Sequence, residues 1–338
     1  MRPDMIQLLD CTLRDGAHVN SGNFGQKCIM NIAGGLADSG LDIVELGFLR
    51  NIDYSPDAAY YPRIEYALEI LKGLPENSGT EYALMARADE YDISQLSECT
   101  GKIRLIRIAF YSDYLDEAVR FAKEISARGY KFTLNLINTP GCSESELNRA
   151  AEYACKIKPY IMTIVDTFGV LMRDSLENIL YRYNSMLDPD ITLGLHTHEN
   201  FSLALSLAQY FADRMNGRRN IAVDASLMGI GRAPGNLCTE LISSWLNDNY
   251  GKNYNVMNML QLIQDNIAPL RKFFSWGYSP AYFLSARHKV HRSYSEYLTA
   301  KNLSLDNIET ILSRIDKVHS GKFSKEYADS LILEVIRS

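Results

Sequence analysis

The sequence predicts an α/β protein, a (β/α)8 TIM barrel followed by a C-terminal helical module. Short apolar runs alternate with longer amphipathic stretches through the first three quarters of the chain, as expected where helices connect the parallel strands of one sheet. Polar and charged residues follow several of these apolar runs directly. A barrel builds its active site at the carboxyl ends of its strands, so this placement favours the barrel over a doubly wound sheet.

The individual elements follow from apolar periodicity. The apolar runs predict strands at residues 6–10, 43–47, 81–86, 105–109, 131–136, 161–166, 192–197 and 222–226. Amphipathic patterns predict helices at residues 28–39, 63–71, 115–128, 144–156, 174–185 and 203–215. Strand signals then stop, and the remaining chain has a helical pattern. We therefore expect a barrel over residues 1–250 and a helical module over residues 251–338, packed on the barrel or over its mouth.

Composition narrows the class of protein. The 338 residues are 46% hydrophobic and 22% charged, which is typical of a globular chain with a large core. The net charge of −6 disfavours a nucleic-acid binder, which would carry a basic stripe. Six cysteines without a C-x-x-C pair predict reduced thiols. With neither a signal-peptide pattern nor an apolar run of about 18 residues, we expect a cytoplasmic protein with no membrane partner.

Two segments supply a candidate metal site. His196 and His198 lie two positions apart at the end of the strand predicted at residues 192–197. If the extended backbone continues to His198, both imidazoles point to the same face. Asp15 follows the first predicted strand and adds a carboxylate. Two histidines and one carboxylate leave coordination positions open, as a catalytic metal requires. The alternative interpretation is a helix-capping aspartate with two structural histidines.

Charged residues near these positions are candidates for catalysis and substrate binding. Arg14 could hold negative charge that develops during a reaction, and His18 has a reference pKa suited to a general base. Arg50, Arg107 and Arg232 are candidate partners of a substrate carboxylate. Salt bridges are the alternative role for each arginine, and an ordinary loop position is the alternative for His18.

Three motifs resemble the signature of the DRE-TIM metallolyase superfamily, the HMG-CoA lyase-like barrels of pyruvate carboxyltransferase type. The motifs are Asp10-x-Thr-Leu-Arg14-Asp15-Gly16, His196-x-His198 and Gly229-x-Gly231-Arg-Ala-Pro-Gly235-Asn236. Within the superfamily, the chain is most similar to the 4-hydroxy-2-oxovalerate aldolases. These aldolases carry a histidine four residues after the motif's arginine, where His18 stands, and a Gly-Tyr pair like Gly277-Tyr278 in their C-terminal module.

The resemblance implies a divalent-metal-dependent aldolase that cleaves a small 4-hydroxy-2-oxo acid to pyruvate and an aldehyde through a metal-stabilised enolate. Mn²⁺ or Mg²⁺, or alternatively Zn²⁺, would be held by Asp15, His196, His198 and, as in the lyase branch, Asn236. Arg14, His18 and Tyr278 would be the catalytic residues. The predicted strand at residues 161–166 contains no lysine, which favours the metal over a Schiff base as electron sink.

Some positions depart from the aldolase pattern. Glu199 replaces a third histidine, Arg232-Ala-Pro234 replaces a glycine-rich turn, and residues 45–50 are closer to the synthase and lyase branches. The alternatives are therefore an acetyl-CoA-dependent Claisen-condensing synthase of the isopropylmalate or homocitrate type and a non-catalytic barrel subunit. The resemblance also implies an acylating aldehyde dehydrogenase as partner. A homodimer is a further expectation, and His288, His291 and His319 are assigned no role.

Overall fold

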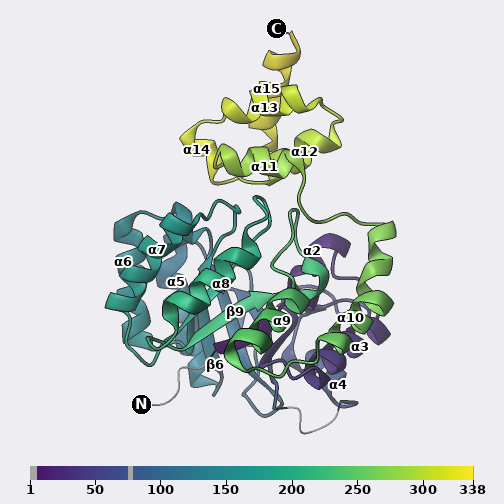
Figure 1. Cartoon of the computed structure of the whole chain (residues 1–338), viewed down its shortest axis with the longest axis vertical. Coiled ribbons are helices and arrows are strands. Elements are labelled where there is room, and N and C mark those ends of the chain that lie inside the picture. The colour runs from purple at the N-terminus through teal and green to yellow at the C-terminus, as the bar shows by residue number, and fades with distance from the viewer. Residues whose placement is uncertain (1–5, 75–78, 338) are drawn as a thin grey trace.

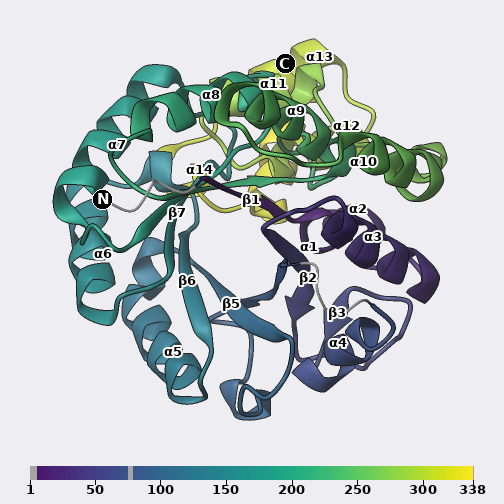
Figure 2. The ribbon, with the colours of Figure 1, turned by 60° about the horizontal axis from the view of Figure 1, so that its bottom comes forward.

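Eight parallel strands close into a barrel in the computed structural model, which describes residues 6–74 and 79–337. The sheet runs from β1 around to β9, which pairs back with β1 (Figure 2). The predicted TIM barrel is confirmed. Its strands are β1 (Ile6–Asp10), β2 (Ile43–Leu49), β4 (Glu81–Arg87), β5 (Ile103–Phe110), β6 (Lys131–Leu136), β7 (Ile161–Val165), β8 (Thr192–His196) and β9 (Ile221–Ala225). The short β3 (Tyr60–Tyr61), which was not predicted, pairs with β2.

The strand sequences explain both layers inside the barrel. Successive side chains of a strand point to opposite faces, so residues two apart share the interior. Ile43, Leu105 and Ala222 belong to one small apolar cluster. Two positions further along the same strands stand Glu45, Arg107 and Asp224, all buried and joined in one ion-pair network. An apolar layer therefore lies beneath a charged layer at the carboxyl ends of the strands.

Amphipathic helices surround the barrel, and each of the six predicted helices is present among them. Around it lie α3 (Gln26–Asp38), α4 (Ile64–Leu71), α5 (Leu115–Ala127), α6 (Glu144–Ile157), α7 (Arg173–Met186), α8 (Ala204–Met215) and α9 (Thr239–Tyr250). Short 3-10 turns occur at η1 (Ile93–Gln95), η2 (Ser112–Tyr114), η3 (Thr139–Gly141) and η4 (Leu227–Gly229). The segment after β1, predicted as a loop, forms two single-turn helices, α1 (Thr12–Asp15) and α2 (Ala17–Asn20).

The chain after the barrel is helical, as predicted, but it divides into two packing units. α10 (Val256–Leu262) and the turns η5 (Ile263–Ile267) and η6 (Ala268–Lys272) join the core of the barrel, which extends to Trp276. A separate hydrophobic core then begins at Leu284. Its helices are α11 (Pro280–Arg287), α12 (Ser293–Ala300), α13 (Leu305–Ser313), α14 (Lys317–Ser320) and α15 (Lys325–Arg337). We therefore propose a boundary near residue 277 rather than at residue 251.

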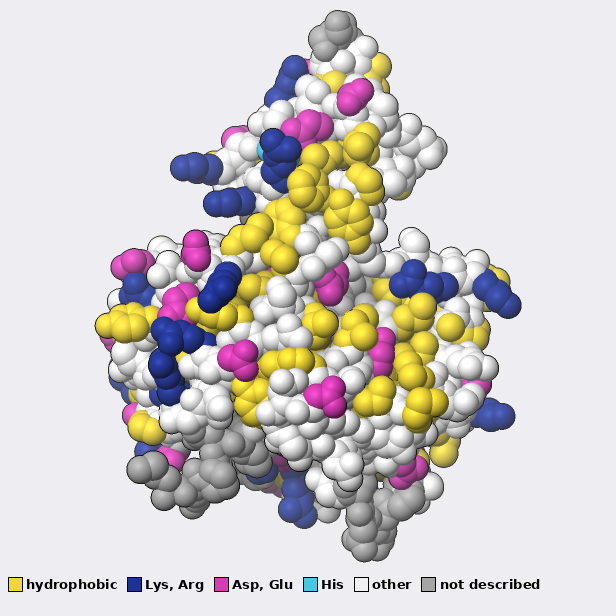
Figure 3. All heavy atoms as spheres, in the orientation of Figure 1, with side chains coloured by type: hydrophobic (Ala, Val, Ile, Leu, Met, Phe, Trp, Pro, Cys, Tyr) yellow, Lys and Arg dark blue, Asp and Glu magenta, His cyan; other side chains and the backbone are white. Residues whose placement is uncertain are grey.

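The helices from α11 to α15, called the cap below, stand over one end of the barrel (Figure 1). Side chains of the cap share one cavity with residues from the carboxyl ends of the strands, so this is the end where the polar layer opens. Figure 3 shows hydrophobic side chains gathered along the junction between cap and barrel on one face. Over the described ranges, none of the helices combines the length and the apolar character that crossing a bilayer demands.

Candidate metal centre and active site

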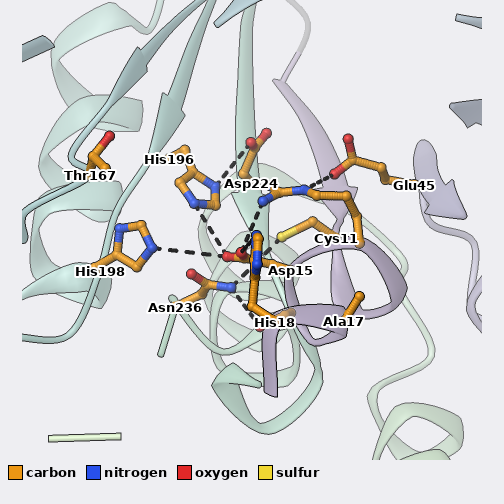
Figure 4. A network of polar contacts seen from close by, with 12 residues as sticks. Cys11, Asp15, Ala17, His18, Glu45, Thr167, His196, His198, Asp224 and Asn236 are labelled. Carbon is orange, nitrogen blue, oxygen red and sulfur yellow. Dashed lines mark hydrogen bonds and ion pairs between the residues drawn. The ribbon is translucent and has the colours of Figure 1, made fainter. Parts of the chain in front are cut away.

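The two histidines and the aspartate predicted from the sequence meet at the mouth of the barrel. His196 ends β8, His198 follows two residues later, and Asp15 lies in α1. The Asp15 Oδ2 atom is 3.6 Å from His196 Nε2 and 4.0 Å from His198 Nε2 (Figure 4). All three side chains are buried. Potential ligand atoms of the three residues lie within 4.8 Å of one another.

The hydrogen bonds around this trio fit a bound cation. His198 Nδ1 lies 2.8 Å from the carbonyl oxygen of Asp166, and this contact requires a proton on Nδ1, because a carbonyl only accepts. The Nε2 lone pair of a neutral His198 is then free to face Asp15. His196 Nδ1 is likewise 3.2 Å from Asp224 Oδ2. Asp15 Oδ2 is buried without a hydrogen-bond partner among the described residues. Hydrogen bonds such as those of the two Nδ1 atoms to the Asp166 carbonyl and to Asp224 orient histidine ligands around a metal.

Asn236 adds an amide oxygen to the same place. Its Nδ2 atom donates to the Ile230 carbonyl at 3.2 Å and to Ser226 Oγ at 3.3 Å. This orientation leaves its Oδ1 atom buried without a described hydrogen-bond partner. A Cβ at Gly231 would lie 2.4 Å from Asn236 Nδ2, so the glycine leaves room for the amide. The loop after β9 thus places a fourth candidate ligand beside His198, with which Asn236 forms an isolated β-bridge.

Arginines balance the carboxylates of the charged layer. Arg14 contacts Glu45 at 2.8 Å and Asp15 at 3.0 Å. Arg107 contacts Glu45 at 2.9 Å, Asn135 at 3.1 Å and also Asp224. Burial alone would raise the pKa of Asp15, but the charge of Arg14 beside it holds that pKa well below its usual range. Asp15 is therefore ionised, as a metal ligand must be.

In this network the guanidinium of Arg107 binds protein groups. The sequence offered it as a partner of a substrate carboxylate, but the structure places it 1% exposed beneath the trio, with its guanidinium bound to Glu45, Asp224 and Asn135. Asp224 in turn contacts His196. Although Arg107 lines the cavity, it is bound by protein partners, one of which, Asp224, contacts the candidate ligand His196.

His18 lies beside the trio but nearer the open space. Its Nε2 atom is 3.8 Å from Asp15 Oδ1, and its side chain is 24% exposed. Its ring meets the Phe48 ring edge-on at 5.4 Å. Desolvation in the cavity, together with the charges of Arg232 and Arg14, lowers the pKa of His18 below its ordinary value despite the opposing effect of Asp15. His18 is thus a neutral base facing the cavity.

A cavity of about 650 Å³ connects these groups with the cap. Arg14, His18, Arg50 and Arg232, four candidates from the sequence, line it. Arg50 lies against the Phe48 and Tyr60 rings, with its guanidinium carbon 4.9 Å and 4.8 Å from their centroids. The volume suits a small molecule.

The cap contributes residues that the sequence did not single out. Tyr282, His291, Arg292 and Glu296 line the cavity, whereas Tyr278 is 56% exposed and is not part of the lining. His291 was assigned no role, and Arg292 was not considered. Their only sequence signal is a cluster of basic residues at positions 287–292, which is equally typical of an exposed helix end.

Comparison with known proteins identifies the family of the barrel. Residues 5–264 match the sequence model of the HMGL-like family. A 4-hydroxy-2-oxovalerate aldolase from Geobacillus genomosp. 3 is 24% identical over 251 residues, covering 72% of this chain and 70% of the relative. A 2-isopropylmalate synthase from Crocosphaera subtropica is 26% identical over 263 residues, covering 71% of this chain and 46% of the relative.

Solved structures share the fold. The N-terminal domain of a Bacteroides vulgatus protein assigned as an aldolase matches with a TM-score of 0.74 at 24% identity, covering 89% of this chain and 98% of that domain. The carboxyl transferase domain of Rhizobium etli pyruvate carboxylase matches with a TM-score of 0.74 at 15% identity. The latter match covers 99% of this chain and 61% of that protein, so the likeness of fold includes the cap.

Proposed function

Because this chain belongs to the HMGL-like family of enzymes, we propose that it is a divalent-metal-dependent aldolase acting on a small 4-hydroxy-2-oxo acid. The observation that carries the proposal is the buried Asp15 Oδ2 atom, which has no hydrogen-bond partner among the described residues and faces His196 and His198. Arg14 and His18 line the same cavity. Relatives at low identity that are named as 4-hydroxy-2-oxovalerate aldolases support the choice of reaction.

The metal would be held by Asp15, His196, His198 and Asn236. A divalent cation bound there supplies Lewis-acid polarisation of the substrate's 2-oxo group. The mixed nitrogen and oxygen donors suit Mn²⁺, with Mg²⁺ and Zn²⁺ as alternatives. Asp224 and the Asp166 carbonyl hold the two imidazoles in place through their Nδ1 atoms.

The remaining chemistry falls to residues on the cavity wall. His18 accepts the proton of the substrate's 4-hydroxyl group while the C3–C4 bond breaks. The electron pair of that bond moves into the pyruvate enolate, whose negative charge Arg14 stabilises in a site shielded from water. Tyr282, directly or through a water molecule, then protonates C3 to give pyruvate. We assign this last step to Tyr282 rather than to Tyr278, because only Tyr282 lines the cavity.

The Claisen-condensing synthase is the second candidate function. It is favoured by the 2-isopropylmalate synthase among the relatives and by the similarity of residues 45–50 to the synthase and lyase branches. It would use the same four metal ligands. Release of free thiol from acetyl-CoA in the presence of a 2-oxo acid would identify it. The acylating aldehyde dehydrogenase partner and the homodimer stay predictions, to be tested by co-purification and by light scattering.

One experiment tests the proposal directly. Purified protein is analysed for bound metal, reconstituted with Mn²⁺, Mg²⁺ or Zn²⁺, and screened for pyruvate release from a set of 4-hydroxy-2-oxo acids. We expect one equivalent of divalent metal and metal-dependent pyruvate release. Thiol release without pyruvate formation would establish the synthase instead, and neither activity in the metal-loaded protein would leave the non-catalytic barrel.

A further inference from the structure

Four hydrogen-bond donors and the carboxylate of Glu296 line the cavity on the side of the cap. We call Arg232, Tyr282, His291 and Arg292 the roof, because three of them belong to the cap that stands over the barrel (Figure 1). The fourth, Arg232, lies in the loop after β9 and donates to Ser293 Oγ of α12 at 2.9 Å. This hydrogen bond ties the loop to the cap, and all four side chains line the cavity.

The positive charge of the roof exceeds its negative charge. Arg292 is 6% exposed, and its Nη1 atom donates to the Thr167 carbonyl at 2.5 Å. Its Nε atom is buried without a hydrogen-bond partner, and no ion pair joins it to a carboxylate in the described part of the chain. Arg232 has one acidic neighbour, Glu296, at 3.8 Å. A buried guanidinium without a counter-ion is costly, so an anionic ligand would complete this surface.

His291 adds a donor to the same surface. The backbone N–H of Ser293 donates to His291 Nδ1 at 3.2 Å. Burial, together with the charges of Arg292 and Arg232, lowers the pKa of His291 to about 3. The neutral ring therefore carries its proton on Nε2. Guanidinium, imidazole N–H and phenol groups together match the oxygens of a carboxylate or a phosphate.

The position of His18 relates the roof to the substrate. His18, Arg232 and Arg292 line the same cavity. In the proposed reaction His18 faces the 4-hydroxyl group. The substituent on C4, which leaves as the aldehyde, then extends from His18 towards the roof. Arg50 lines the same cavity, and its Nε atom also lacks a described hydrogen-bond partner.

We propose that the aldehyde half of the substrate carries a second anionic group, a carboxylate or a phosphate monoester, which Arg292 and Arg232 bind. This inference rests on the proposed aldolase function and specifies its substrate class. When C3–C4 breaks, its electron pair goes to the pyruvate enolate and the hydroxyl proton goes to His18. The product aldehyde keeps the anionic group. Because the bidentate fork of arginine matches carboxylate and phosphate, the roof would select charged aldehydes over uncharged ones.

The test runs the reaction in the condensing direction with metal-loaded enzyme, pyruvate and matched pairs of aldehydes. Butanal is compared with succinic semialdehyde, and glyceraldehyde with glyceraldehyde 3-phosphate, so that the carboxylate and the phosphate are tested separately. We expect one charged aldehyde to exceed its uncharged match by about 30-fold or more in kcat/KM, the effect of losing charge-assisted hydrogen bonds. Equal kcat/KM values within both pairs would overturn the proposal.

Variants test which residues carry the preference. Arg292→Gln and Arg232→Gln should each reduce the ratio of charged to uncharged kcat/KM by about tenfold or more. The matched control is Arg287→Gln, an exposed arginine of α11 outside this cavity, which should keep the ratio. An unchanged ratio in both roof variants contradicts the assignment. If Arg292→Gln fails to fold, Arg292→Lys and Arg232→Gln provide the comparison.

A binding measurement separates this inference from the proposed function. Calorimetry on the full metal-free chain measures the affinity for inorganic phosphate and for propionate, and Arg292→Gln should weaken the better of the two by about tenfold or more. Unchanged affinity, or no binding of either anion, refutes the roof as an anion site. Metal-dependent exchange of the pyruvate methyl protons reports on the aldolase itself, so exchange with a preference for uncharged aldehydes would overturn only the inference.

Discussion

The cavity has two walls of opposite design. The floor, at the carboxyl ends of the strands, pairs each of its arginines with carboxylates. Among the described residues, Asp15 Oδ2 and Arg107 Nε of the floor have no hydrogen-bond partner. In the roof, Glu296 pairs with Arg232 alone, and the Nε atom of Arg292 has no hydrogen-bond partner among the described residues. The floor therefore suits a cation and the roof an anion. The comparison teaches that one cavity can present opposite charges to the two ends of a substrate.

The metal ligands of the floor should give the largest effect. The His196→Ala/His198→Ala double variant leaves one carboxylate and one amide oxygen, too few for a tight divalent site. We expect loss of bound metal and a fall in activity of about a thousandfold or more, comparable to the loss of several kcal/mol of Lewis-acid stabilisation. Metal content is measured by mass spectrometry, with His288→Ala of the cap as control. Full metal occupancy in the double variant would refute the site.

Arg14 should come next, because it separates chemistry from binding. Arg14→Ala should lower kcat by about a hundredfold or more, as when an oxyanion donor is lost. Arg14→Lys should restore little, because a point charge does not reproduce the guanidinium fork shared by Glu45 and Asp15. Steady-state kinetics and metal analysis check both variants. A raised KM with unchanged kcat would show that Arg14 only binds substrate.

His18 should show a smaller and selective effect. His18→Ala removes the base for the 4-hydroxyl proton, so cleavage should slow by about a hundredfold. Exchange of the pyruvate methyl protons does not involve that hydroxyl and should slow much less. Both rates are followed by NMR in deuterated buffer at saturating metal. Equal losses would mean that His18 is not the hydroxyl base and that the floor needs another.

An ion pair between Glu177 and Arg214 on the outside of the barrel should give the smallest effect. It serves as a reference because it lies outside both walls of the cavity. Glu177 of α7 accepts hydrogen bonds from Arg214 and Tyr210 of α8, which lower its pKa from 4.5 to about 2. A lowered folded-state pKa stabilises the fold above pH 4.5 and loses this contribution as the pH falls towards 2. Glu177→Gln should therefore cost roughly 1 kcal/mol at pH 7 and less at pH 3.5.

Chemical denaturation of wild type and Glu177→Gln at both pH values measures this difference. The aldolase kcat should stay at the wild-type value, since Glu177 lies outside the cavity lining. A stability loss of the same size at both pH values would indicate that packing, not the charge of Glu177, carries the effect. A change in kcat would mean that the outer helices are coupled to the floor.

The floor could be predicted because its residues belong to regular elements. The two-residue periodicity of a strand places His196 and His198 on one face, and Asp15 follows the first strand, so the strand ends bring them together. The barrel itself followed from apolar runs at regular spacing. Even here, the sequence could not show that Arg107 pairs with Glu45 and Asp224, because that pairing depends on which strands become neighbours.

The roof could not be predicted in the same way. The match of Gly277-Tyr278 to the aldolase pattern placed Tyr278 at the site, but the turn before α11 leaves it exposed and brings Tyr282 to the cavity. His291 and Arg292 sit between two short helices with weak amphipathic patterns. The direction in which the two side chains point depends on how the cap packs over the barrel. No local sequence periodicity encodes this packing.

The sequence by itself determined the barrel, the chemistry of its strand ends and the family, because strand periodicity and motif spacing act over a few residues. The tertiary structure alone decided which arginines are free and where the cap core begins, because these depend on contacts between segments far apart in the chain. Arg107 lies 117 residues from the aspartate that holds it, and Arg292 lies 125 residues from the carbonyl oxygen that it binds. The burial of Arg292 without an ion-pair partner among the described residues, on which its proposed role rests, exists only once those segments meet.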